Sequence, residues 1–324
     1  MHRFRSRPLR LEAQTLSACL LAASLLSACL LSACLLSACL LAAPAAAQQA
    51  GEGLSPTLAN IKATHSVRVG YRESSPPFSF VDHSNRPIGY SLELCDAIVD
   101  EIGTEVDDTG LKIDYVKVTS DDRIPAVVDK KVDLECGSTT ANAERGKQVA
   151  FSPLMFVAGT KLMVPKASGV TQVADLKGKT VVVTKGTTNE QAMHNVDAKQ
   201  QLGLNIVTSP DHEQSYQMLV DGKADAFATD DILLYGLIAQ HKSQDKFRVT
   251  GDYLSYDPYG IMFRKGEPEM KDVVERAFRK LATNHDIIPL YNKWFVGRLP
   301  TGEKLNVALS PQLEDAFKVL DDSE

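Results

Sequence analysis

Short apolar runs alternate with stretches of helical periodicity along the chain from about residue 57 onward. Apolar residues recur every three or four positions in the helical stretches, whereas expected strands are short and continuously or alternately apolar. A helix is expected to start at Ser91, with Leu94 and Ile98 on one face, and another is expected around Ile124–Val128. The strands expected in this half of the chain lie at 67–71, 78–81, 88–90 and 113–118.

A second cycle of strands and helices follows the first. The expected strands lie at 162–164, 180–183, 206–207 and 226–228, and the helical stretches at 190–199 and 215–220. The chain then returns through Tyr259–Phe263 and ends in helices at 273–281 and 287–296. Alternation of this kind favours open, mainly parallel sheets covered by helices. We therefore predict an α/β protein with two lobes joined by hinge strands, and a ligand cleft beyond the strand ends.

The first 47 residues have the layout of a secretory signal. Four arginines precede an apolar run from Leu16 to Ala43, and Ala45-Ala46-Ala47 offers a cleavage site. The run repeats Ser-Ala-Cys-Leu-Leu, so Leu36–Cys39 also resembles a lipoprotein processing site, and an uncleaved run of this length could span a bilayer. Cleavage and soluble export is the first interpretation, ahead of a lipid anchor at Cys39 and an uncleaved anchor. All three place the remaining chain outside the inner membrane, in the periplasm.

The expected organisation has five segments. They are a signal peptide at 1–47, a linker at 48–56, a first lobe at 57–157, a second lobe at 158–255, and a return to the first lobe with C-terminal helices at 256–324. The chain has 35 Lys and Arg against 41 Asp and Glu. The leader holds four Arg and one Glu, so cleavage after Ala47 leaves a net charge of −9. A chain this acidic, without a basic run, is a poor binder of nucleic acid.

Only two of the six cysteines, Cys95 and Cys136, lie outside the leader. They could pair in an oxidising compartment or remain two buried thiols, and the sequence does not decide between these alternatives. Cys-x-x-Cys and His-x-x-x-His spacings are absent, so we expect neither a bound metal nor another cofactor.

A polar turn at residues 135–145 is the first candidate for a ligand site. An apolar segment runs into Gly137, Ser138 and two threonines, after which a short helix is expected to begin. The free N–H groups of a helix start attract anions, and Arg145 could clamp the same anion from five residues beyond Thr140. The alternative is an ordinary capped turn with a solvated arginine.

The second cycle repeats this pattern at Gly186-Thr187-Thr188, where an expected strand gives way to a helix. Thr187 and Glu190 have the spacing of a capping box. Two such turns, one in each lobe, could face each other across a cleft. The repetition favours the ligand-site interpretation of both turns.

The order and spacing of these motifs resemble the periplasmic amino-acid-binding proteins of ABC importers, solute-binding protein family 3, and most of all their glutamate/aspartate-binding members. The resemblance covers nearly the whole chain beyond the leader. The shared residues include 70–75, 77–78, 89–91, 119–120, 123–125, 135–140, 144–145, 175–179, 186–188, 211–212, 230–231 and 293–295. The resemblance implies the type II periplasmic binding protein fold. It also implies a monomer that binds a free acidic amino acid and delivers it to an inner-membrane permease/ATPase complex.

The resemblance also implies roles for nine residues. By analogy, Arg145, the Thr140 backbone N–H and Thr188 would hold the ligand α-carboxylate. Asp230 would accept the α-ammonium, helped by the Ser138 carbonyl and the Thr140 hydroxyl. The side-chain carboxylate would be held by three expected cations and one hydroxyl: Arg72, Arg123, His212 and Ser120. A dry cleft that encloses two carboxylates and an ammonium needs a partner for each of them.

Each assignment has a plainer alternative. Arg72 and Arg123 both stand beside acidic residues and could form surface ion pairs. His212 could be only a turn or helix-start residue. Either Asp230 or Asp231 could accept the ammonium while the other caps the next helix.

One departure from the family concerns the cysteines. Relatives often carry a cysteine just after the Tyr-Gly that corresponds to Tyr259-Gly260, and this chain has Ile261 there. If Cys136 pairs with that cysteine in relatives, the bond cannot form here. Cys95 would then be the only partner within the cleaved chain.

Two other classes of function remain open. Some proteins of this fold are dehydratases of cyclic amino-acid precursors, for which Glu73 is a conceivable general acid, but no catalytic motif accompanies it. A ligand-sensing ectodomain would have to signal through a separate partner, because no later membrane span is seen in this chain. We therefore predict a binding protein, not an enzyme, whose preference among glutamate, aspartate and their amides the sequence leaves open.

Overall fold

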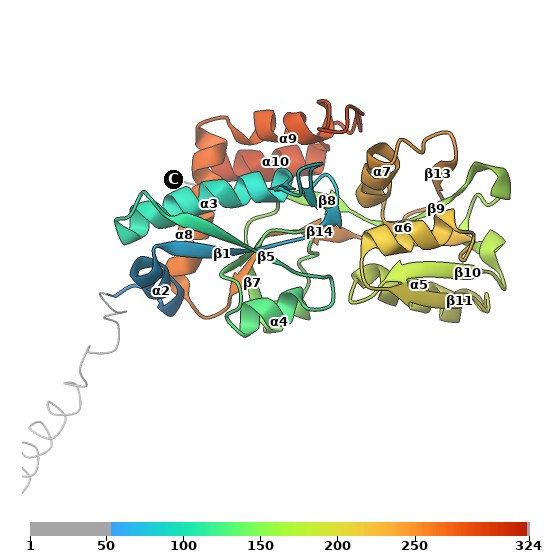
Figure 1. The fold of residues 1–324 in the computed structure, drawn as a ribbon, viewed down its shortest axis with the longest axis horizontal. Helices are drawn as coiled ribbons and strands as arrows, with labels where there is room; N and C mark the ends of the chain where they lie inside the picture. The colour runs from blue at the N-terminus through green and yellow to red at the C-terminus, as the bar shows by residue number, and fades with distance from the viewer. Residues whose placement is uncertain (1–52, 323–324) are drawn as a thin grey trace, which may run out of the picture. The chain divides into compact units, whose positions relative to one another are not determined.

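The computed structural model describes residues 53–322 (Figure 1). The predicted signal peptide, its repeat, the Cys39 processing site and the start of the linker all lie outside the described residues. The first described helix, α2, spans Pro56–Thr64. Among the described residues, every helix is too short or too polar to cross a bilayer.

The first lobe is built on a mixed sheet with strand order β5-β1-β6-β15-β7. Its strands are β1 (Ser66–Tyr71), β5 (Lys112–Lys117), β6 (Leu134–Glu135), β7 (Val149–Phe151) and β15 (Met262–Arg264). β5, β1 and β6 run parallel, as the helical crossovers α3 (Tyr90–Val106) and α4 (Arg123–Val128) require. The sheet was predicted to be mainly parallel, and β15 is the exception, because it is antiparallel to both of its neighbours.

The second lobe has the same plan, with strand order β11-β10-β12-β9-β13. Its strands are β9 (Thr160–Pro165), β10 (Thr180–Thr184), β11 (Asn205–Ser209), β12 (Ala226–Asp230) and β13 (Phe247–Thr250). Its helices are α5 (Thr188–Gln200), α6 (His212–Val220) and α7 (Asp231–Gln240), with 3₁₀ turns at Lys166–Ser168 and Val173–Leu176. β11, β10 and β12 are parallel, and β9 and β13 complete the sheet in antiparallel register.

Two short strands connect the lobes. β8 (Phe156–Ala158) leads into β9, β14 (Asp257–Tyr259) returns from the second lobe, and the two pair antiparallel. The expected return segment Tyr259–Phe263 includes the end of β14 and the start of β15, which Gly260 and Ile261 separate. The backbone at Gly260 packs against Phe151, where an added Cβ would lie 3.3 Å from the Phe151 Cβ.

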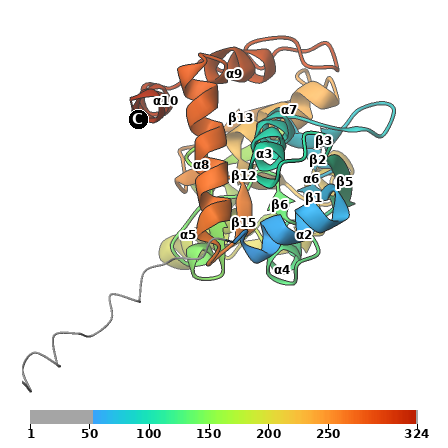
Figure 2. The same cartoon turned by 90° about the vertical axis from the view of Figure 1, so that its left-hand side faces the viewer.

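The predicted hairpin around Ser84-Asn85 is present on the first lobe. It is formed by β3 (Ser79–Val81) and β4 (Pro87–Ile88), with β2 (Ser74–Ser75) beside β3. The C-terminal part folds into α8 (Pro268–Thr283), α9 (Ile287–Phe295) and α10 (Pro311–Asp321), of which α10 was not predicted. α8 lies alongside both α3 and α10 (Figure 2).

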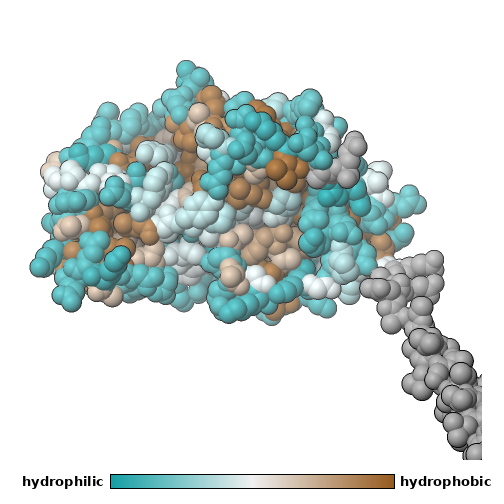
Figure 3. Space-filling view, turned by 180° about the vertical axis from the view of Figure 1, so that it is seen from behind, coloured by the Kyte–Doolittle hydropathy of each residue, from teal (hydrophilic) through white to brown (hydrophobic). Residues whose placement is uncertain are grey.

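Aromatic side chains fasten the connecting strands to the first lobe. Phe156 of β8 stacks on Phe295 of α9 with ring centroids 4.8 Å apart, and Tyr259 of β14 meets the edge of Phe78 at 5.1 Å. These rings are fully or nearly fully buried. On the face seen in Figure 3, apolar surface forms patches interrupted by polar residues. The aromatic cluster of Phe78, Phe156, Tyr259 and Phe295 is interior. Its packing sets where β8 and β14 leave the first lobe.

Cys95 and Cys136 form a disulfide, which settles the alternatives that the sequence left open. Their Cα atoms are 6.3 Å apart, and both side chains are buried. The bond links α3 to the residue directly after β6. It therefore restrains the polar turn that was the first candidate for a ligand site.

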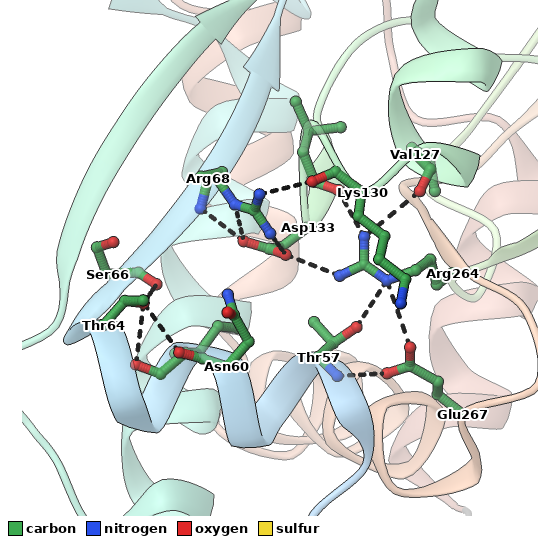
Figure 4. Close-up of polar contacts among 12 residues, drawn as sticks. Thr57, Asn60, Thr64, Ser66, Arg68, Val127, Lys130, Asp133, Arg264 and Glu267 are labelled. Carbon is green, nitrogen blue, oxygen red and sulfur yellow. Dashed lines mark hydrogen bonds and ion pairs between the residues drawn. The ribbon is translucent and has the colours of Figure 1, made fainter.

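A buried ion-pair network ties α2, β1, β6 and β15 together at the opposite end of the first sheet (Figure 4). The fully buried Asp133 carboxylate accepts bonds from Arg68 Nη2 at 2.7 Å and from Arg264 Nη2 at 2.8 Å. Arg264 also donates to the Val132 carbonyl at 2.9 Å and to Thr57 Oγ1 at 2.8 Å. The bond to Asp133 raises the pKa of Arg68. Every charge in this network has a partner, as burial requires.

Replacing Asp133 with asparagine should destabilise the protein by about 3–5 kcal/mol, because the buried Arg264 guanidinium loses one of its two carboxylate partners and keeps only Glu267. Chemical denaturation measures this free energy of unfolding. The control is Asp129→Asn, whose exposed pair with Lys131 spans 3.7 Å and should contribute less than about 1 kcal/mol. Equal losses of unfolding free energy for the two substitutions would contradict the stabilising role of Asp133.

Candidate functional site

All nine predicted site residues lie at or beyond strand ends, on the sides of the two sheets that face each other. Eight of them are no more than 8% exposed, and Thr188 is partly buried. In the first lobe, Arg72 follows β1, Ser120 lies between β5 and α4, and Arg123 begins α4. Ser138, Thr140 and Arg145 follow β6. In the second lobe, Thr188 begins α5, His212 begins α6, and Asp230 ends β12.

The two lobes touch each other through several of these residues. The Thr140 and Thr188 hydroxyl oxygens are 3.2 Å apart, and Arg145 Nη2 donates to the Gly186 carbonyl at 3.3 Å. Ser75 Oγ lies 3.1 Å from His212 Nδ1. At Gly186 the backbones are so close that an added Cβ would stand 2.6 Å from the Asp121 Cα. The described structure is therefore a closed cleft with the predicted residues inside it.

The turn after β6 differs from the prediction. No α-helix begins between Thr140 and β7. This segment contains only a three-residue 3₁₀ turn, at Arg145–Lys147. Asn142 Oδ1 accepts the Arg145 backbone N–H at 2.9 Å, while Arg145 Nη1 donates to the Thr140 carbonyl at 2.9 Å. The candidate anion-binding group at this turn is thus the Arg145 guanidinium, held by its own loop, and not the N-terminus of an α-helix.

The corresponding turn in the second lobe does begin a helix, as predicted. Thr187 is the N-cap of α5, and its side chain accepts the Glu190 backbone N–H at 3.2 Å. Glu190 accepts the Gly186 N–H at 3.0 Å. The backbone N–H of Thr188, at the first position of α5, has no acceptor within its own helix. The Thr188 hydroxyl contacts Thr140 of the first lobe, so the start of α5 lies at the cleft.

Several buried polar atoms in the cleft have no hydrogen-bond partner among the described residues. Both terminal nitrogens of Arg72, Nε of Arg123 and Nε2 of His212 are unpartnered. Further unpartnered atoms are Ser120 Oγ, Ser138 Oγ and Glu135 Oε1. Most buried polar groups in proteins are paired, so a cluster of free donors at one place points to a ligand with several acceptors.

The arginines in the cleft repel one another in a dry environment. Burial, followed by the positive charge of Arg123, lowers the pKa of Arg72 to about 10 and that of Arg145 to about 9. Burial also lowers the pKa of Arg123. The Glu135 carboxylate opposes the lowering of the pKa at all three arginines. Thr139 Oγ1 donates a hydrogen bond to this carboxylate at 2.7 Å. An anionic ligand would relieve this repulsion.

His212 is not the third cation that was expected. Burial, and then the charges of Arg72 and Arg123, lower its pKa well below 6.5. The imidazole is therefore neutral at pH 7. Its Nδ1 lies 3.1 Å from Ser75 Oγ, and its Nε2 has no hydrogen-bond partner among the described residues.

Asp230 and Asp231 occupy different surroundings. Asp230 is buried, accepts Asn189 Nδ2 at 2.8 Å, and accepts the Tyr259 hydroxyl at its other oxygen. Burial, and then the charge of Asp257, raise the pKa of Asp230 to about 8. Asp231 instead accepts the Tyr253 hydroxyl at 2.7 Å in an exposed contact. Of the two carboxylates, Asp230 is the one placed among the other site residues.

Four residues that the sequence did not single out complete the site: Glu135, Asn189, Asp257 and Tyr259. Glu135 and Asn189 lie within the two polar turns, so their positions were a signal that could have been used. Asp257 and Tyr259 lie on β14, and no local pattern placed them in the cleft. Thr140 and Thr188 border a cavity of about 430 Å³ together with Asp257, and Arg72 borders another of about 540 Å³. Within residues 53–322, no three acidic, His or Cys side chains gather in a way that could hold a metal.

Comparison with known proteins gives consistent matches. The profile of the bacterial extracellular solute-binding proteins, family 3, matches residues 67–297. An L-glutamate/L-aspartate-binding protein of Pseudomonas aeruginosa is 40% identical over 271 residues, covering 83% of this chain and 90% of its own. A glutamate/aspartate import solute-binding protein of Escherichia coli is 36% identical over 275 residues, covering 85% and 91%.

Solved structures agree with the sequence matches. An ancestral amino acid-binding protein, described as a precursor of cyclohexadienyl dehydratase, superposes with a TM-score of 0.63 and is 31% identical. The match covers 74% of this chain and 99% of that protein. The chain therefore belongs to family 3 of the bacterial extracellular solute-binding proteins.

Proposed function

We propose that this protein captures acidic L-amino acids outside the inner membrane and delivers them to an ABC transporter permease. The observation that carries the proposal is the set of buried, unpartnered donors in the closed cleft, beside a carboxylate suited to an ammonium group. The relatives from Pseudomonas aeruginosa and Escherichia coli, which are named for glutamate and aspartate, support the same ligand class.

The amino-acid head group would be held from both lobes. Arg145 and the N–H groups of Thr140 and Thr188 would bind the α-carboxylate. Asp230, the Ser138 carbonyl and the Thr140 hydroxyl would accept the α-ammonium. These contacts pair each charge of the head group, which offsets the cost of taking it out of water.

Selectivity for an acidic side chain would come from the other end of the site. Arg72 and Arg123 carry unpartnered guanidinium nitrogens, and Ser120 and His212 add neutral hydrogen-bonding groups. Two guanidinium groups favour a carboxylate over the corresponding amide, because the amide carries no charge to relieve their repulsion. Binding of glutamate or aspartate would thus stabilise the closed cleft over an open one, and the permease would recognise the closed form.

Export and assembly are part of the proposal. We propose that residues 1–47 act as a cleaved signal peptide, with a lipid anchor at Cys39 as the alternative, and that the protein works as a monomer in the periplasm. The family of extracellular solute-binding proteins supports a location outside the inner membrane.

The dehydratase alternative has little support in the geometry. Glu73, its conceivable general acid, is paired with the exposed Lys117 at the surface. The structural neighbour described as a dehydratase precursor is itself an amino acid-binding protein. The relatives are binding proteins, and this chain is not an enzyme.

A thermal-shift screen of residues 48–324 against the common amino acids should show stabilisation by glutamate and aspartate. A ligand present at 100 times its dissociation constant stabilises the folded state by about 2.7 kcal/mol. Glutamine and asparagine are compared in the same plate, and we expect them to raise the melting temperature less. If neither glutamate nor aspartate raises the melting temperature, the proposed function is wrong.

Replacing Arg123 with methionine should weaken glutamate binding by about thirtyfold or more, because a buried carboxylate loses a charged partner worth roughly 2–5 kcal/mol. Glutamine should lose less affinity, since its side chain carries no charge. Isothermal titration calorimetry measures both. Arg86→Met, which removes an exposed arginine of the hairpin, is the matched control and should leave both affinities unchanged. A similar loss for glutamate and glutamine would refute the assignment of Arg123 to the side-chain carboxylate.

Ligand binding should release protons near neutral pH. Asp230 has a pKa of about 8 in the ligand-free cleft, so it is largely protonated at pH 7, and a nearby ammonium favours its charged form. The bound state then holds fewer protons, and affinity should rise as the pH increases from 6 toward 8. Calorimetry at pH 7 in buffers of different ionisation enthalpy counts the protons released. Asp230→Asn should abolish the release and Asp231→Asn should retain it, whereas a wild-type protein that releases none would contradict the role of Asp230.

A further inference from the structure

Asp257 joins the two lobes at the head-group end of the cleft. It is the first residue of β14, and its side chain is 1% exposed. Its Oδ1 accepts Thr140 Oγ1 of the first lobe at 3.0 Å and Thr188 Oγ1 of the second lobe at 2.7 Å. Ser255 donates to its other oxygen. One carboxylate on a connecting strand thus receives hydroxyl groups from both walls of the cleft.

These bonds determine which way the two hydroxyl groups point. A threonine hydroxyl has one hydrogen to donate and two lone pairs, whereas a carboxylate only accepts. Bonds to a carboxylate are stronger than the alternative bond between the two hydroxyls, whose oxygens are 3.2 Å apart. Both hydrogens therefore point to Asp257. Each oxygen then presents only lone pairs to a ligand.

The same strand orients the other acceptor of the head group. Asp257 and Tyr259 are two residues apart on β14, so their side chains lie on one face of the strand. Tyr259 donates to Asp230, while Asp257 receives Thr140 and Thr188. β14 thus contacts three of the groups proposed to surround the head group, namely Asp230, Thr140 and Thr188. A group with several N–H donors fits there, and a group with a single O–H or none leaves acceptors unpaired.

We propose that Asp257 is a positioning residue that makes the head-group site require an α-ammonium. It does so by holding the Thr140 and Thr188 hydroxyls as acceptors. The contribution of the second lobe to the α-carboxylate then comes from the backbone N–H at the start of α5, not from the Thr188 hydroxyl. This inference rests on the proposed function, in which the ligand is an acidic amino acid.

The test compares two ligands that differ only at the α-substituent, L-glutamate and L-2-hydroxyglutarate, in wild type and Asp257→Asn. The asparagine amide donates hydrogen bonds, so one threonine hydroxyl turns and can donate to the ligand hydroxyl. The ratio of the two affinities, measured by calorimetry, should fall at least tenfold relative to wild type. A purely structural role for Asp257 would lower both affinities by the same factor, and an unchanged ratio would overturn the proposal.

Controls separate this inference from the proposed function. Asp252→Asn changes an exposed carboxyl in the segment between β13 and β14 and should leave both affinities unchanged. If Asp257→Asn does not fold, Thr188→Val removes one oriented acceptor and keeps the backbone N–H. It should weaken glutamate at least tenfold more than 2-hydroxyglutarate, and equal losses would again overturn the proposal. A wild-type protein that binds no acidic amino acid would overturn the proposed function and this inference with it.

Discussion

The burial of three arginine side chains between two lobes is the constraint on which the rest of the site depends. Burial, and then the positive charge of Arg123, lower the pKa values of Arg72 and Arg145. Within the described residues, Glu135 opposes this charge from the first lobe. Such an arrangement is costly unless an anion enters. The closed cleft is therefore most stable with an acidic ligand inside it.

Two kinds of buried charge can be told apart in this structure. Around Asp133, every charged group has a partner, and the network joins α2 to three strands of the first sheet. In the cleft, Arg72 has no partner for either terminal nitrogen among the described residues. The paired charges around Asp133 stabilise the first lobe without a ligand, whereas the Arg72 nitrogens remain free to bind one. Whether the buried charges are fully paired thus distinguishes the structural network from the candidate ligand site.

The connecting strands contribute more than a hinge. β14 brings Asp257 and Tyr259 to the head-group end of the cleft, where both bond to residues proposed to bind the ligand. Aromatic packing of β8 and β14 against the first lobe holds this strand in place. The disulfide from Cys95 to Cys136 restrains the facing turn. Candidate ligand residues on both walls, Thr140 and Thr188, therefore share one partner on β14.

Local periodicity was enough to predict the α/β alternation, and turn chemistry was enough to predict the hairpin and the capped start of α5. The order of the motifs indicated the residue types of the candidate site. Tertiary structure decided the disulfide, the absence of a helix after Thr140, the division of 259–263 between two strands, and the roles of Asp257 and Tyr259. It also decided that His212 is neutral, since the pKa of an imidazole depends on burial and on arginines distant in the chain. Local patterns cannot report such properties, because they arise from groups that only folding brings together.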